Sequence, residues 1–238
     1  MTGLLYGTGR SVLFASILMA AVLLVGTGIG TVAAQSAPDC STVSYNGEGT
    51  GSNPYEVGNV DQLQCIKEQE LGANYVQVAD IDASETEEWN GGDGFDPIGE
   101  ANLARDTEFT GTFDGANHTI SGLTIDRGST NDVGLFGVVQ IGRLENVSLE
   151  NVDITGSSSV GGLVGLNDAA GTVTESYASG SVIGDQAVGG LAGYNYRSTV
   201  EMSYMNGGVS GARTADHECR DVSQSDHAFR RASGGGDA

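Results

Sequence analysis

From residue 133 onward the chain repeats one pattern of apolar residues and glycines. Val133-Gly134-Leu135-Phe136-Gly137 returns as VGGLVG at residues 160–165 and as VGGLAG at residues 188–193, at offsets of 27 and 28 residues. Repetition at such a period is typical of solenoids, because one repeat cannot bury its own apolar face and must stack on its neighbours. Each repeat is therefore predicted to form one coil.

Within a repeat, apolar and polar residues follow one another in short runs. Their spacing is closer to the period of 2 of a strand than to the 3.6 of a helix. Thr, Val and Ile also favour strands over helices. The pattern predicts an all-β fold, a parallel β-helix with coils of about 28 residues, nearly free of helices between residues 109 and 209. The apolar positions of one such stretch are Leu144, Val147, Leu149, Val152 and Ile154.

The strands are separated by residues that tolerate sharp corners. Gly adopts positive φ without strain, and Asn tolerates the left-handed region better than most residues. We expect Asn146, Asn167 and Asn195 to occupy such corners.

The region before the repeats contains an earlier coil and one candidate helix. Residues 117–125 are predicted to form a strand, a turn and a strand, preceded by residues 109–115. From Asp61 to Leu71 the apolar residues suit a short helix, with Asp61 as a carboxylate at its start. Such a helix would cap the open sheet edge at this end of the solenoid.

Several of these motifs resemble those of the GLUG-motif repeats of secreted and surface bacterial and archaeal proteins. The resemblance covers about residues 47–208 and includes residues 53–57 (NPYEV), 109–115 (FTGTFDG), 160–165 (VGGLVG) and 176–182 (SYASGSV). It implies a right-handed β-helix similar to adhesin passenger regions, with roles in adhesion or substrate binding, sometimes beside peptidase modules. This array is short and no catalytic module accompanies it.

The chain is strongly acidic, with 31 Asp and Glu against 10 Lys and Arg, a net charge of −21 and Lys67 as its only lysine. This balance disfavours nucleic acids and anionic membrane surfaces as partners. Self-repulsion of this size is screened by salt. The composition therefore suits a salt-loving source organism, with an ordinary acidic secreted protein as the alternative.

The N-terminus has the pattern of an export signal. Arg10 precedes an apolar run over residues 11–25, and Val32-Ala33-Ala34 offers small residues for cleavage. We expect residues 1–34 to be a signal peptide, with an uncleaved anchor as the alternative, and the protein to be secreted or at the cell surface. Residues 35–108 would then form an N-terminal cap and first coils, and residues 109–208 the GLUG-type repeats.

The repeat register vanishes after about Gly208, and residues 209–238 have a different composition. We interpret them as a disordered tail, or as the product of a frame shift or truncation that ended a longer repeat array.

The cysteines suggest one cross-link. Outside the cell, Cys40 and Cys65 could form a disulfide that ties down the start of the mature chain, leaving Cys219 free. Two unpaired thiols are the alternative.

Residues that carry chemistry are sparse. His118 is the one histidine of the repeat region and could form a triad with Asp114 and Ser121, although a solvated corner histidine explains it better. The carboxylates near it would be candidate acids, bases or calcium ligands, with Arg105 and Arg127 as the nearby cations, but solvated surface acids are the simpler interpretation. These carboxylates are Asp80, Asp82, Asp114 and Asp126.

Two further motifs are candidate sites. Asn90, Asp93 and Asp96 lie in a Gly-rich loop that could hold calcium, although its spacing matches no EF-hand and an ordinary turn explains it. Asn117 and Asn146 begin N-x-S/T sequons and are candidate glycosylation sites.

Tyrosines recur near the repeat corners and could stack on sugars, or pack as a core ladder. These are Tyr177, Tyr194, Tyr196 and Tyr204. The sequence thus predicts a non-enzymatic surface scaffold or adhesin-like protein. It predicts no cofactor, with calcium as the one candidate. The partner is not identified, and glycans or cell-surface components are the candidates. The alternatives are a carbohydrate-active or calcium-dependent binding protein, and a remnant of a larger surface peptidase or adhesin.

Overall fold

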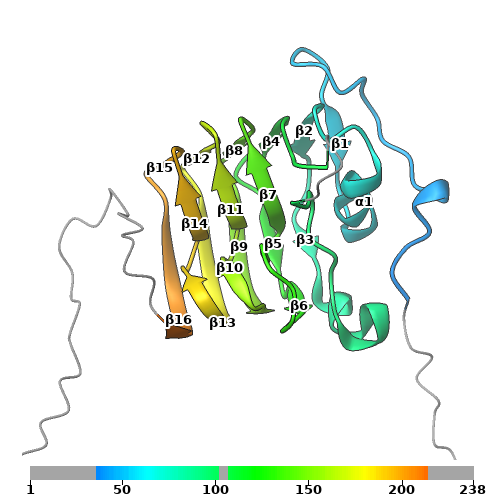
Figure 1. The fold of residues 1–238 in the computed structure, drawn as a ribbon. Helices are drawn as coiled ribbons and strands as arrows, with labels where there is room; N and C mark the ends of the chain where they lie inside the picture. Colours follow the sequence, from blue (N-terminus) through cyan, green and yellow to red (C-terminus); the bar gives the residue numbers. More distant parts are fainter. Residues whose placement is uncertain (1–35, 102–106, 214–238) are drawn as a thin grey trace, which may run out of the picture. The chain divides into compact units, whose positions relative to one another are not determined.

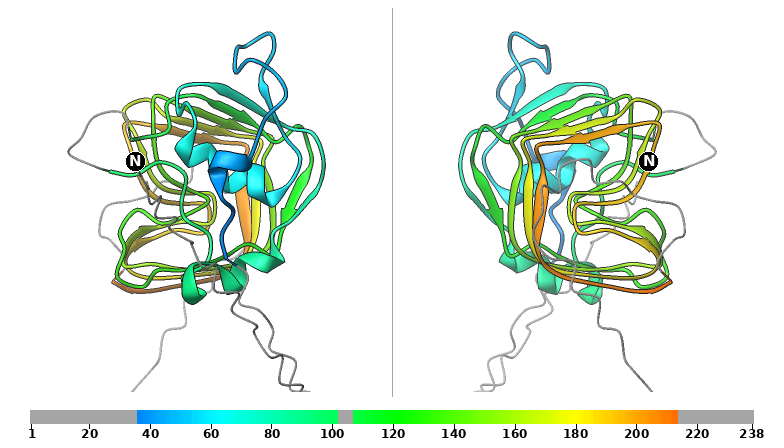
Figure 2. Two further views of the ribbon diagram at one scale, coloured as in Figure 1. Left: turned by 90° about the vertical axis from the view of Figure 1, so that its right-hand side faces the viewer. Right: turned by 90° about the vertical axis from the view of Figure 1, so that its left-hand side faces the viewer.

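In the computed structural model, residues 36–101 and 107–213 are described, and they form a β-solenoid of about four turns (Figure 1). The predicted signal peptide and the chain beyond residue 213 lie outside the described residues. Viewed along the solenoid, successive coils superimpose (Figure 2). The predicted all-β fold of about 28-residue coils is confirmed.

Three parallel sheets form the walls: the first two have strands from the early coils to the last, and the third has strands from the last three described coils. The first is ordered β1 (Tyr55–Val57), β2 (Asn74–Gln77), β4 (Thr112–Asp114), β8 (Arg143–Glu145), β12 (Thr172–Thr174), β15 (Thr199–Glu201). The second contains β3 (Ile81–Asp82), β5 (Thr119–Ser121), β6 (Thr124–Asp126), β9 (Ser148–Thr155), β10 (Ser158–Val160), β13 (Tyr177–Val188) and β16 (Tyr204–Arg213). The third is β7 (Phe136–Gln140), β11 (Val164–Asp168) and β14 (Ala192–Tyr196).

The strand register reproduces the repeat read from the sequence. Val133 bridges to Val160, which lies opposite Val188 in the next coil. Like residues therefore stack on like residues along the solenoid. The inward columns form one continuous apolar core, in which Leu163 is fully buried, as are Leu144, Leu149 and Ile154.

The last glycine of the repeat is required by close backbone contact. A Cβ on Gly165 would lie 2.3 Å from the carbonyl carbon of Asp132, and one on Gly193 would lie 2.3 Å from the amide nitrogen of Val160. Any larger residue would push the third sheet away from the chain segment that crosses it.

The corners only partly follow the prediction. Asn146 has a φ of 54° and occupies a left-handed corner as expected. Asn167 and Asn195 do not: they lie within β11 and β14, where the Asn167 side-chain amide donates to Asn195 Oδ1 at 2.8 Å. The left-handed corner after β11 is formed by Ala169 and Ala170 instead. The prediction was wrong because an inward asparagine ladder competes with the corner role.

The predicted cap helix is present and shorter than expected. Helix α1 (Val60–Cys65) continues as the 3₁₀ turn η2 (Ile66–Glu68) and stops before Leu71. The Asn59 side chain caps its start by accepting from the amide of Gln62 at 2.9 Å. Glutamates disfavour a helix C-terminus, and the chain has them where the predicted helix would have ended. Two other 3₁₀ segments occur, η1 (Cys40–Thr42) and η3 (Ser84–Gly92).

At the other end the regular coil extends past the predicted boundary at Gly208. Strand β16 continues to Arg213, which lies opposite Gln186 of β13. Strand pairing therefore persists although the apolar repeat motif has ended, since backbone hydrogen bonds do not depend on side-chain identity. In the described part of the chain, no helix is long and apolar enough to cross a bilayer.

Candidate binding surface

The first pair of conspicuous outward side chains is Tyr177 and Tyr204, which open β13 and β16 and lie opposite each other in register. Their rings are 4.8 Å apart between centroids, and Tyr204 is 61% exposed. The next residues, Ala178 and Met205, turn toward the core, as strand alternation requires. These two tyrosines thus stand outside the core as an aromatic pair.

The second pair lies on β14. Tyr194 and Tyr196 face away from the inward Asn195, with nearly parallel rings 6.2 Å apart. Tyr196 is 43% exposed, and the guanidinium carbon of Arg197 lies 4.9 Å from its ring centroid. This pair lies on a different sheet from Tyr177 and Tyr204, and only Tyr177 and Tyr204 are called the tyrosine surface below.

Arg197 differs from the other cations whose side chains the structure describes. Lys67, Arg127 and Arg143 each pair with a carboxylate. Arg197 has no ion pair among the described residues, and its guanidinium lies over the ring of Tyr196. Its charge is therefore available to an oxygen-rich ligand without the cost of breaking an ion pair.

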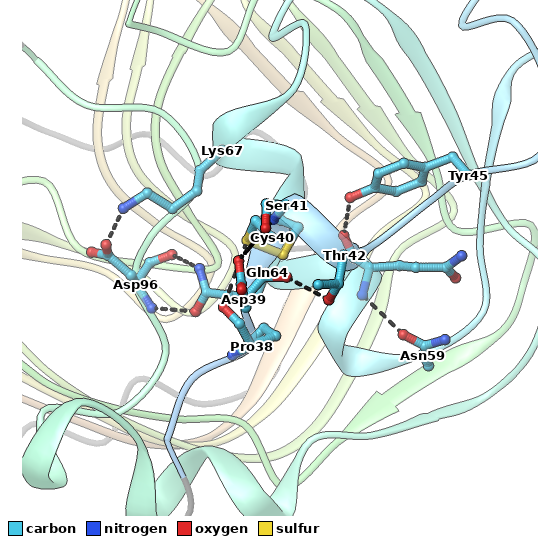
Figure 3. The surroundings of a disulfide bond; sticks show 12 residues. Pro38, Asp39, Cys40, Ser41, Thr42, Tyr45, Asn59, Gln64, Lys67 and Asp96 are labelled. Carbon is cyan, nitrogen blue, oxygen red and sulfur yellow. Dashed lines mark hydrogen bonds and ion pairs between the residues drawn. A yellow bond between two sulfur atoms is a disulfide. The ribbon is translucent and has the colours of Figure 1, made fainter. Parts of the chain in front are cut away.

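The loop considered for calcium is organised by protein groups. The Asn90 side-chain amide donates to the carbonyl of Gly94 at 2.7 Å. Asp96 is neutralised by Lys67 (Figure 3) and by Arg127, whose guanidinium lies 3.3 Å away. The described residues contain no group of three or more His, Cys, Asp or Glu side chains able to hold a metal ion. Asn90 and Asp96 are thus already engaged by protein groups, and calcium binding by Asn90, Asp93 and Asp96 stays a prediction.

His118 does not pair with the expected acid. Its Nδ1 lies 3.3 Å from Oδ1 of Asp80, which also accepts the backbone amide of Thr119 at 2.9 Å. That amide, and secondarily His118, lowers the pKa of Asp80. Asp114 instead accepts from the backbone amide of Ala116 at 2.8 Å. The imagined triad of Asp114, His118 and Ser121 is therefore not assembled.

The remaining candidates have local structural roles. The Ser121 hydroxyl lies 3.5 Å from the carbonyl of Ile81. Asp82 accepts the amide of Ser84 at 3.0 Å, which lowers its pKa, and Asp126 ends β6 as an exposed residue. Arg127 donates from Nε to the carbonyl of Phe95 at 3.1 Å. Arg105 lies outside the described residues.

The cysteines predicted to pair are joined in the structure. The Cys40–Cys65 disulfide ties the N-terminal segment to the end of α1 (Figure 3). Next to it, Gln64 is almost completely buried and exchanges two hydrogen bonds of 2.9 Å with the backbone of Asp96. This cluster closes the N-terminal end of the solenoid.

Comparison with known proteins identifies the family to which one coil of the repeat belongs. Residues 156–183, which span one coil, match the family described as the GLUG motif. The chain carries a GLUG motif. Its sequence is 41% identical over 180 residues to "Halomucin" of Haloquadratum walsbyi, which covers 74% of this chain and 2% of that protein. It is 36% identical over 133 residues to a "Putative Gly-rich membrane protein" of Evansella cellulosilytica, covering 53% of this chain and 15% of that protein.

The GLUG-motif chain thus spans a small part of these relatives. Among solved structures, a "putative immunoglobulin A1 protease" from Bacteroides ovatus is 17% identical, with 68% of this chain and 69% of that chain covered and a TM-score of 0.35. Likeness at this level carries no functional argument.

Two features of the surface escaped sequence reasoning. Arg197 belongs to no motif, and only the ion pairs of the other cations make it conspicuous. The second is the pairing of His118 with Asp80: the sequence named this carboxylate as a candidate but matched His118 to Asp114, whereas stacking of coils brings His118 to Asp80, 38 residues earlier. The tyrosines were found by their recurrence, and the structure decides between the two interpretations in favour of outward positions.

Proposed function

We propose that the chain is an exported, non-enzymatic scaffold of the cell surface that binds glycans through its tyrosine surface. The observation that carries this proposal is the adjacent pair of half-buried Tyr177 and exposed Tyr204 on the outer wall of a regular solenoid. The ring of Tyr177 extends the aromatic face of Tyr204, which is 61% exposed, and a contiguous aromatic patch of this kind supports a binding role where a single exposed side chain would not.

The chemistry of the tyrosine surface suits sugars. Aromatic faces pack against the C–H faces of pyranose rings, while phenol hydroxyls reach sugar oxygens at the rim. Tyr and Arg are also the residues that most often dominate binding energies in interfaces. On the third sheet, Arg197 beside the Tyr196 ring offers a separate donor for sugar hydroxyls or carboxylates.

Location at the cell surface is supported by three independent features. Residues 1–34 have the pattern of an export signal. One relative is named a membrane protein, and the GLUG-motif chain aligns with 133 of its residues. A disulfide between Cys40 and Cys65 is also typical of an oxidising, extracellular environment.

Acidity supports a salty environment for this scaffold. A net charge of −21 opposes folding by self-repulsion, and salt screens that repulsion over distances of about 10 Å or less. We expect the chain from Gln35 onward to show a β-type circular dichroism spectrum whose melting temperature rises steeply from low to multimolar salt. A melting temperature independent of salt would contradict this part of the proposal.

Glycan binding is tested by an array of cell-surface glycans probed with the exported chain in high salt. Tyr177→Ala combined with Tyr204→Ala is expected to weaken binding at least about tenfold, as loss of a central aromatic anchor does. Met202→Ala is the matched control, since Met202 is 64% exposed in the same coil and is not aromatic. Unchanged binding by the double variant, or release of sugar products from a bound glycan, would overturn the proposal.

A further inference from the structure

The two sequons of the chain occupy the same corner of adjacent coils. Strands β5 and β9 pair in parallel, with Thr119 of the first sequon opposite Ser148 of the second. The strands that precede the corners also pair, with Asp114 opposite Glu145. The sequence motif alone treats the two acceptors alike, so any difference between them must come from the conformation of the corner.

The corners differ in length. Residues 115–118 connect β4 to β5, whereas only residues 146–147 connect β8 to β9. The longer corner forms a tight turn, in which the amide of His118 donates to the carbonyl of Gly115 at 2.8 Å. Ala116 and Asn117 have φ values of 49° and 62°, the two successive left-handed residues of a type I′ turn. The added residues carry Asn117 out of the wall.

Asn146 is held between coils. Its side-chain amide donates to Oδ1 of Asp114 at 2.9 Å. Its carbonyl oxygen lies 2.2 Å from the position that a Cβ on Gly115 would occupy, so the neighbouring coil lies directly against it. On its other side, its backbone amide donates to the carbonyl of Thr174 in the next coil. The side-chain nitrogen that would receive a glycan is therefore already hydrogen-bonded to Asp114, and Asn146 lies in a half-buried corner.

Asn117 has the opposite environment. Its side chain is exposed, and its amide group has no hydrogen-bond partner among the described residues. The adjacent His118 pairs through Nδ1 with Oδ1 of Asp80, 3.3 Å away, and not with the Asn117 amide. Transfer to this nitrogen requires no native hydrogen bond to break.

We propose that Asn117, and not Asn146, is an N-glycosylation site of the folded, exported chain, an inference that rests on the export in the proposed function. The reaction is supplied by a cellular oligosaccharyltransferase and a lipid-linked oligosaccharide. The amide nitrogen of Asn117 bonds to the anomeric carbon, the bond from that carbon to the lipid phosphate oxygen breaks with its electron pair, and the nitrogen loses one proton to the enzyme. The wall of the first coils then carries a glycan beside β5.

The test compares the folded chain with the denatured, reduced chain as substrates for one oligosaccharyltransferase and a lipid-linked oligosaccharide in vitro, in the highest salt the enzyme tolerates. Glycopeptides are quantified by mass spectrometry. In the folded chain, Asn117 is expected to be modified at least about tenfold more than Asn146, since a hydrogen bond to a charged acceptor must break at Asn146. In the denatured chain the two sites are expected to be modified to similar extents.

Matched variants sharpen the result. Asn117→Gln is expected to lower total modification of the folded chain at least about tenfold, Asn146→Gln to change it little, and Asp114→Ala to raise modification at Asn146 by releasing its amide. Equal modification of both sites in the folded chain would overturn the inference, as would a folded chain unmodified at Asn117 when the denatured chain accepts a glycan there. Because the assay requires neither export nor glycan binding, its failure is separable from failure of the proposed function.

Discussion

The two ends of the solenoid are built from the same repeat and differ in how their apolar columns are covered. At the N-terminal end α1 and the disulfide lie over the first coil, and Val60, Leu63 and Ile66 join the core. In the last coil the same inward columns are partly open: Val209 is 47% exposed, whereas Val182, its neighbour one coil earlier, is 0% exposed. Burial of a repeat residue is thus set by the coil next to it as much as by its own identity.

An aromatic ladder reinforces this contrast. Ring contacts with centroid distances between 4.9 and 6.2 Å run from the N-terminal segment into the middle coils. Stability of a solenoid is approximately a sum of coil terms and contacts between neighbouring coils, so an end coil with one neighbour opens first. The rings belong to Tyr45, Tyr55, Tyr75, Phe109, Phe113 and Phe136.

The largest effect is expected from placing one charge in a covered middle coil and one in the partly uncovered last coil. Leu163→Asp should cost about 4 kcal/mol or more, because an unpaired carboxylate replaces a side chain that is 0% exposed. Leu191→Asp, one coil later and 8% exposed, should cost about half as much because water reaches it. Urea unfolding in high salt measures both values, and equal costs would show that the last coil is as well covered as the middle.

Removing the cross-link tests the covered end. Cys40→Ser with Cys65→Ser should lower the free energy of unfolding by about 3 kcal/mol, as expected for a loop with a sequence separation of 25 residues. Reductant added to the unaltered chain should reproduce the loss. If neither treatment shifts the unfolding midpoint, the N-terminal segment contributes nothing to the stability of the cap.

A corner substitution should stabilise the middle coils. Ile141 has a φ of 53°, which is strained for a β-branched residue, and its side chain is 65% exposed. Ile141→Asn should therefore raise the free energy of unfolding by about 1 kcal/mol. Ile141→Val keeps the strain and should give no gain, so a similar rise in both variants would contradict this explanation.

The smallest effect concerns a titrating group. Burial raises the pKa of Asp132, partly offset by a hydrogen bond from Ser159. An acid with a raised folded-state pKa favours folding below its unfolded pKa and loses that contribution as the pH rises through the folded value. Asp132→Asn should thus leave stability unchanged near about pH 3 and raise it by less than about 1 kcal/mol at neutral pH. A gain confined to acidic pH would refute the sign.

Sequence reasoning recovered what depends on periodicity. The stacking of Val133, Val160 and Val188 followed directly from their offsets. Sequence reasoning failed where contacts depend on corner length. Asn167 points inward and hydrogen-bonds to Asn195, and His118 pairs with Asp80 of the preceding coil. The early coils have irregular lengths, so no constant offset identifies their neighbours. The difference between Asn117 and Asn146 has the same origin, since two added residues change the exposure of an otherwise equivalent site.

Parallel pairing between coils has a mechanical consequence. The hydrogen bonds that join neighbouring strands run along the solenoid axis, so a pull on the two ends loads them in tension and opens one coil at a time. Each opened coil of about 28 residues would release about 90 Å of chain. Because α1 and the disulfide hold the first coil, a tether under load would lengthen in steps from the last coil toward the cap and refold in the reverse order.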